Sequence, residues 1–186
     1  MKKMLDRAIN RENLKFVANL LIDVEYTVFF GTALGIHRDG DVLLKDDDVD
    51  ILANSNDYNI IKTILTSNGY IHHIDTNGIF SQFRKTIDGE HTLLDCYFFE
   101  EYDEDNVIEK WNFSGDYAQS SNHIIIPNEL ILTKNIEYFG VKLKVPSNLE
   151  AVCTWLYGER YKETLVKDID YTHQIINNKP VIGYKK

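Results

Sequence analysis

The chain has 186 residues, a formal net charge of −9 at pH 7, and 44% hydrophobic residues. This length and hydrophobic content predict a single domain over residues 1–186 and argue against intrinsic disorder. The acidic balance disfavours nucleic acid as a partner, because nucleic-acid binding favours a clustered basic surface. Two cysteines give no disulfide framework. No segment reaches the roughly 20 apolar residues of a membrane span, so we expect a cytoplasmic protein without a transmembrane segment.

Hydrophobic periodicity and turn residues predict helices and strands that alternate along one continuous chain. We expect an amphipathic helix over residues 3–25, broken near Asn10 and Arg11. The elements expected after it are a strand over 26–30, a short helix over 32–38, a helix over 58–67, a hairpin of strands 79–87 and 92–99, short strands over 124–126, 129–133 and 141–145, and a closing helix that opens over 148–157.

The most informative stretch joins a small-residue turn at Gly31 and Thr32 to an acidic run over residues 46–50. Because neighbouring side chains of a strand point to opposite faces, Asp48 and Asp50 share one face. Two adjacent carboxylates repel unless a cation lies between them, and Mg²⁺ or Mn²⁺ suits such oxygen ligands. Backbone amides of the Gly-Thr turn can hold phosphate oxygens. A phosphate cradle beside metal-binding carboxylates predicts phosphoryl or nucleotidyl transfer.

A third candidate carboxylate lies in the strand expected over residues 92–99. Asp95 is the charged residue in the middle of this apolar run, and alternation places it on one face with Leu93 and Tyr97. An unpaired charge in a strand core is costly, so Asp95 should face a metal, a basic partner or solvent. If this strand pairs with the strand of Asp48 and Asp50, about 4.8 Å away, three carboxylates converge. The alternative is a carboxylate on a solvated sheet face.

Two cations flank these elements. Arg38 follows the Gly-Thr turn, and its planar guanidinium could bind a phosphate. Lys45 directly precedes the acidic run, where it could neutralise phosphate charge or merely offset the neighbouring carboxylates. Both residues are candidate phosphate ligands together with Gly31 and Thr32.

This constellation resembles the signature of the LicD/fukutin-related family within the nucleotidyltransferase superfamily. The resemblance covers about residues 14–165 and rests on Gly31, Thr32, Leu34, Gly35 and Arg38, the run over 46–51, and the closing segment with Pro146, Trp155, Leu156, Tyr157 and Gly158. It implies an α+β nucleotidyltransferase fold, with a mixed β-sheet flanked by α-helices, and places Asp95 at the third carboxylate. Family members commonly carry Pro-Trp before the acidic run, where this chain has Leu44 and Lys45. This departure leaves the substrate open.

The resemblance implies a metal-dependent transferase that moves a phospho-alcohol group, such as phosphocholine, from a CDP-linked donor. The implied acceptor is a hydroxyl of a glycan or a related cell-surface precursor. Mg²⁺ or Mn²⁺ held by Asp48 and Asp50 would bridge the donor phosphates, while Asp95 would hold a second metal or accept the proton of the attacking hydroxyl. Attack on the distal phosphate, with release of CMP, is what the resemblance implies, and the residues alone do not exclude attack on the α-phosphate.

Two alternatives stay open at this point. A nucleotidyltransferase that adds NMP from an NTP to a small molecule or a protein would share the same strand-turn-strand core. A non-catalytic nucleotide-binding homologue is the other alternative, which the short length and the altered flank of the acidic run allow. The sequence specifies neither the acceptor nor the oligomeric state.

Overall fold

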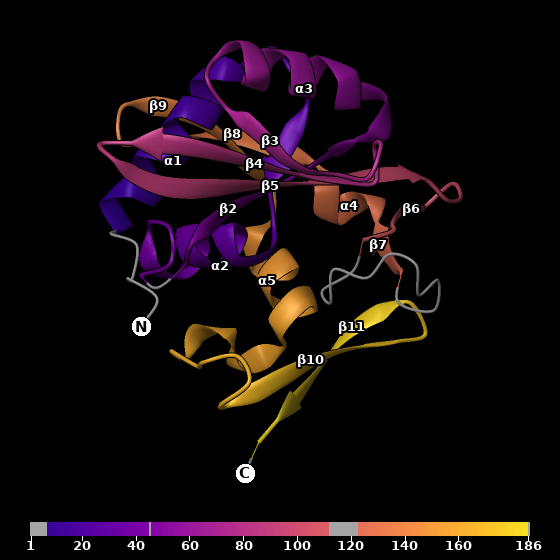
Figure 1. Ribbon diagram of the computed structural model, residues 1–186. Helices are drawn as coiled ribbons and strands as arrows, with labels where there is room; N and C mark the ends of the chain where they lie inside the picture. Colours follow the sequence, from indigo (N-terminus) through magenta and orange to yellow (C-terminus); the bar gives the residue numbers. More distant parts are fainter. Residues whose placement is uncertain (1–6, 45, 112–122, 186) are drawn as a thin grey trace.

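The computed structural model describes residues 7–44, 46–111 and 123–185 (Figure 1). In chain order its elements are α1 (Arg7–Leu20), β1 (Tyr26–Val28), α2 (Phe30–Asp39), β2 (Asp48–Asn54), η1 (Ser55–Asp57), α3 (Tyr58–Ser67), β3 (Ile71–Asp75), β4 (Phe80–Ile87), β5 (Glu90–Glu101), β6 (Asn106–Glu109), β7 (Ile124–Pro127), α4 (Asn128–Ile131), β8 (Thr133–Tyr138), β9 (Val141–Pro146), α5 (Leu149–Tyr157), η3 (Glu159–Lys162), β10 (Tyr171–Ile176) and β11 (Lys179–Tyr184).

The largest sheet of the described residues has seven strands. Its order is β1-β2-β5-β4-β3, with β6 paired to β5 and β7 paired to β6. β2 and β5 run parallel, and their register places Asp50 directly beside Asp95. The other pairs in this sheet are antiparallel. The pairing on which the convergence of the three carboxylates depends is therefore confirmed.

Helices cover both faces of this mixed sheet, as Figure 1 shows for α3 above it and α2 below it. The alternation in β5 buries Leu94, Cys96 and Phe98 in the core. Asp95 and Tyr97 point to the opposite face, where the ring of Tyr97 packs on Phe30 of α2 with centroids 4.4 Å apart. The expected α+β class with helices around a mixed sheet is confirmed.

Two expected elements differ from the structure. α1 runs without a break through Asn10 and Arg11, because the side chain of Asn10 bonds to residues outside the helix and does not compete for its backbone. The strand expected over residues 129–133 is instead the short helix α4, followed by β8. Glu129 stands in the first turn, where its negative charge favours the N-terminus of a helix. Residues 3–6 of the first predicted helix lie outside the described residues.

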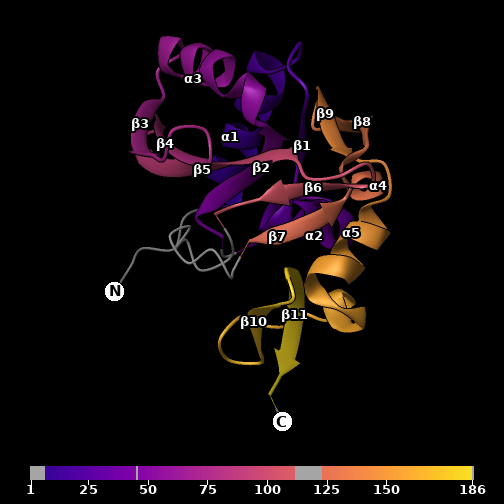
Figure 2. The ribbon, with the colours of Figure 1, turned by 90° about the vertical axis from the view of Figure 1, so that its right-hand side faces the viewer.

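A C-terminal hairpin of β10 and β11 was not expected from the sequence. Its turn residues Asn177 and Asn178 have φ of 52° and 60°, which suits a two-residue hairpin turn. The side-chain Nδ2 of Asn178 donates to the backbone carbonyl of His123 at 2.8 Å, and the hydroxyl of Tyr184 donates to the backbone carbonyl of Tyr157 at 2.9 Å. The hairpin is thereby attached both to the segment before β7 and to the end of α5 (Figure 2).

No helix in the described part of the chain combines the length and the apolar character that a membrane span requires. The single domain over residues 1–186 stays a prediction.

Candidate active site

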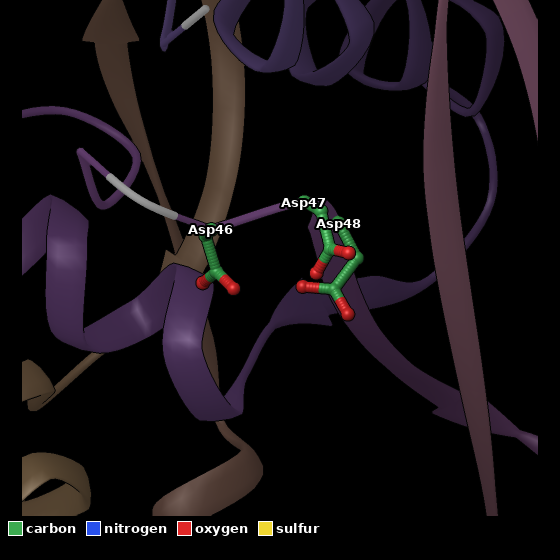
Figure 3. A group of neighbouring side chains, drawn as sticks. All are labelled: Asp46, Asp47 and Asp48. Atoms are coloured by element: carbon green, nitrogen blue, oxygen red, sulfur yellow. The ribbon is translucent and has the colours of Figure 1, made fainter. Parts of the chain in front are cut away.

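Three carboxylates meet where β2 and β5 run side by side. One oxygen each from Asp48, Asp50 and Asp95 lies within 4.8 Å of the other two. Asp46, Asp47 and Asp48 form a second group with the same spacing, so Asp48 belongs to both groups. Figure 3 shows the second group gathered at the start of β2. The sheet register and the strand alternation therefore bring together all three predicted metal ligands.

The start of α2 lies against these carboxylates. Phe30 opens the helix with a φ of 44°, which is uncommon for a residue with a side chain and turns the chain sharply after β1. The amide of Thr32 donates to Oδ2 of Asp50 at 3.3 Å, and the amide of Asp50 donates to Oγ1 of Thr32 at 2.8 Å. A Cβ atom on Gly31 would come within 2.9 Å of Asp46 Oδ2 and 3.2 Å of Asp50 Oδ2. Thr32 thus positions Asp50, and Gly31 leaves open space beside two carboxylates.

The charged forms of these carboxylates are disfavoured by burial and by mutual repulsion. Burial raises the pKa of Asp95 to about 7, with a further contribution from the charge of Asp48. Burial and the charge of Asp48 raise the pKa of Asp46 to about 8. The pKa of Asp50 is raised well above its ordinary value by burial and by the three surrounding carboxylates. Among the ion pairs of the described residues, none includes Asp50 or Asp95, although Gln82 donates to Asp95 Oδ1 at 2.8 Å.

These observations fit a divalent metal. The donors are all carboxylate oxygens, which hard cations such as Mg²⁺ and Mn²⁺ prefer. Their mutual repulsion is the cost that a bound cation removes. Because Gly31 has no side chain, the space beside Asp46 Oδ2 and Asp50 Oδ2 is not filled from this position.

A buried polar network supports the carboxylates from behind. The side-chain Nδ2 of Asn10 donates to the backbone carbonyl of Asp46 at 2.8 Å, and the hydroxyl of Thr92 donates to Asn10 Oδ1 at 2.5 Å. Asn13 donates to the carbonyl of Leu93 at 2.9 Å. Sequence reasoning assigned this helix to core packing alone. The sequence feature that could have indicated this network is a pair of asparagines, three residues apart, on the helix face that also carries Leu14 and Val17.

Asp46, Asp48 and Asp50 line a cleft of about 590 Å³, a size that suits small-molecule sites. Asp95 groups with Asp48 and Asp50 beside it, and we call these four residues the carboxylate floor. The same cleft is also lined by residues between 164 and 173, a segment that we call the C-terminal wall. Thr164, Leu165, Val166, Lys167, Tyr171 and His173 of this wall line the cleft.

The predicted phosphate ligands have different surroundings. Arg38 lines the cleft, but its Nε donates to Asp39 Oδ1 at 2.8 Å and another guanidinium nitrogen donates to the carbonyl of Glu163 at 3.3 Å. Lys45 lies outside the described residues, so the structure does not place it. The phosphate-binding roles of Gly31, Thr32 and Arg38 stay predictions.

Residues 23–148 match the family model for the LicD/FKTN/FKRP nucleotidyltransferase domain. The chain belongs to this family. Membership supports a transferase that acts on nucleotide-linked substrates, and the matched region includes the whole carboxylate floor. The C-terminal wall lies beyond it. No curated protein sequence matches the chain.

Solved structures share the fold at low sequence identity. A crystal structure of the lincosamide antibiotic adenylyltransferase LnuA, with lincomycin bound, superposes with a TM-score of 0.55 at 15% identity, covering 79% of this chain and 85% of that one. A putative nucleotidyltransferase from Thermotoga maritima gives a TM-score of 0.48 at 15% identity, covering 81% and 84% of the two chains. The likeness to the adenylyltransferase confirms the nucleotidyltransferase fold.

Proposed function

We propose that this protein transfers a phospho-alcohol group, of the phosphocholine kind, from a CDP-linked donor to a hydroxyl of a glycan or a related cell-surface precursor. The observation that carries the proposal is the parallel register of β2 and β5, which gathers Asp48, Asp50 and Asp95 in a family of nucleotidyltransferase domains. The cleft above them has the size of a small-molecule site.

Asp48, Asp50 and Asp95 would hold Mg²⁺ or Mn²⁺. A divalent cation bound there supplies charge neutralisation for the donor phosphates and for the leaving nucleotide. Thr32 fixes the orientation of Asp50, and Gln82 fixes that of Asp95. Asp95 would serve either as a ligand or as the group that accepts the proton of the attacking hydroxyl. The packed rings of Tyr97 and Phe30 form an apolar part of the cleft lining beside the site.

The test is the identity of the released product. The purified protein with Mg²⁺ is incubated with CDP-choline, CDP-polyols or labelled NTPs, together with hydroxyl-bearing glycan precursors. We expect CMP from a CDP-linked donor and transfer of the labelled alcohol phosphate to the acceptor. Asp50→Asn serves as the inactive control, and Asp103→Asn, in the exposed loop after β5, serves as the matched active control.

Other products would replace this proposal by a different function. Pyrophosphate from an NTP, with no CMP from any CDP-linked donor, would establish NMP transfer to a small molecule or a protein. Metal-dependent nucleotide binding without any product from any donor would instead indicate a non-catalytic homologue.

A further inference from the structure

Three cations from the described residues line the cleft, and two of them are already paired. Arg7 lies 3.1 Å from Asp41, and Arg38 lies 2.8 Å from Asp39. The third is Lys167 of the C-terminal wall. Its ammonium has no hydrogen bond and no ion pair with any residue that the structure describes. Lys167 is therefore the described cation of this cleft that has no carboxylate partner.

The backbone on both sides of Lys167 is held in place. The amide of Val166 donates to Asp170 Oδ2 at 2.7 Å, and the amide of Asp170 donates back to the carbonyl of Val166 at 2.8 Å. The amide of Asp168 donates to the carbonyl of Tyr171 at 2.7 Å. These bonds close a tight turn just before β10. The turn fixes the backbone position of Lys167. Less conformational entropy is therefore lost when its side chain contacts a ligand.

The side chain of Lys167 lies beside an aromatic part of the wall. The ring of His173 contacts Tyr157 and Tyr171 edge-on, each with centroids 5.2 Å apart. Burial, together with a smaller effect of the positive charge of Lys167, lowers the pKa of His173 to about 4. The imidazole is thus neutral at pH 7 and adds no second cation to the wall. Lys167 carries the charge of this side of the cleft.

Lys167 and three carboxylates of the floor line the same cleft, so one bound phosphate could contact both. A donor phosphate at the carboxylate floor carries negative charge on several oxygens, and those directed away from the floor could contact the C-terminal wall. A lysine ammonium binds phosphate oxygens as a point charge with three donors. No other described cation that lines the cleft is without a carboxylate partner.

We propose that Lys167 binds a phosphate of the nucleotide donor from the C-terminal wall, in the cleft that it shares with the carboxylate floor. This inference rests on the proposed function, because it takes a nucleoside diphosphate group as the ligand. It assigns a donor contact to a residue outside the matched family region of residues 23–148.

The test compares ligands that share a base and a sugar but differ in phosphate. Affinities of CDP, CMP and cytidine are measured by calorimetry with Mg²⁺ present, for the wild type, Lys167→Gln and Lys167→Arg. The matched control is Lys179→Gln, an exposed lysine of β11 that does not line the cleft. We expect Lys167→Gln to weaken CDP binding about tenfold, the effect of losing one charge-assisted hydrogen bond. Cytidine binding should stay unchanged, Lys167→Arg should restore most of the CDP affinity, and Lys179→Gln should behave as the wild type.

Two results would overturn the inference while the proposed function stands. One is an unchanged CDP affinity in Lys167→Gln, and the other is an equal loss for cytidine and CDP. An increase confined to the KM of the acceptor would assign Lys167 to the acceptor and would also overturn it. If the wild type binds none of the three ligands with Mg²⁺, the proposed function fails and this inference fails with it. Thermal unfolding of each variant checks the fold, and we expect no shift because the replaced side chain is exposed.

Discussion

The carboxylate floor and the C-terminal wall belong to one cleft region but are built in different ways. Asp50 and Asp95 are only 5% and 7% exposed, and each is oriented by a neighbouring side chain. Lys167 is exposed, and a local turn holds only its backbone. The floor lies inside the matched family region and the wall lies outside it. Under the proposed function, the sheet would carry the chemistry and the wall would contact the substrate.

The largest expected effect comes from removing one charge of the floor. Asp50→Asn keeps the shape of the side chain and its bond from the Thr32 amide, but it removes a proposed metal ligand. We expect kcat to fall by at least about 10²–10³-fold, the scale for losing a main electrostatic contact at a reacting group. The metal-free variant should be as stable as the wild type or more stable, because a repelled buried charge is gone. Steady-state kinetics and thermal unfolding measure the two effects, and full activity in Asp50→Asn would contradict the role of the floor.

A pair of glycine substitutions separates chemistry from folding within the same helix. A Cβ on Gly31 would meet the tips of Asp46 and Asp50, whereas a Cβ on Gly35 would come within 2.6 Å of the Asp41 carbonyl and 2.8 Å of the Leu43 amide. Carboxylate tips can move but backbone cannot. We expect Gly31→Ala to lower kcat about tenfold or more with little change in stability. Gly35→Ala should cost about 1–3 kcal/mol of unfolding free energy. Equal stability losses for the two variants would contradict this distinction.

The smallest expected effect is a pair of opposite pH dependences in the metal-free protein. Asp95 has a pKa raised from 3.8 to about 7, so the folded state keeps a proton that the unfolded chain releases. Stability should therefore fall as the pH rises from about 4 to about 7. His173 has a pKa lowered from 6.5 to about 4, so the folded state resists a proton that the unfolded chain binds. Stability should fall as the pH drops from about 6.5 to about 4.

Denaturant unfolding in chelator across this pH range separates the two regions. Asp95→Asn should reduce the loss above pH 4, to which Asp46 and Asp50 also contribute, and His173→Gln should flatten the loss below pH 6.5, each by about 1 kcal/mol or more. A profile that neither substitution changes would show that the two groups titrate alike in the folded and unfolded states.

Strand alternation is local, so the sequence placed Asp48 and Asp50 on one face and identified Asp95 as a third candidate carboxylate. The pairing of their two strands was an assumption, which the structure confirms. The sequence was not sufficient for contacts between distant segments. The bond of Asn10 to the Asp46 carbonyl joins residues 36 apart, and no periodicity reports it.

The wall was missed for a related reason. Lys167 is one of several lysines near the C-terminus, and its position in the cleft depends on how the hairpin docks on β7 and α5. The strand expected over residues 129–133 was wrong because a short apolar run fits a helix and a strand equally well.

The most direct test of the carboxylate floor is the affinity of CDP measured in chelator and in Mg²⁺. Without a cation, the clustered carboxylates repel a diphosphate, by about 4 kcal/mol for two charges 4 Å apart at an effective dielectric of 20 and by less for partly solvated groups. We predict at least about tenfold tighter binding in Mg²⁺, or about 1.4 kcal/mol. Asp48→Asn and Asp95→Asn should blunt this difference, whereas Asp103→Asn should preserve it. Equal affinity with and without chelator would show that these carboxylates do not organise the nucleotide site.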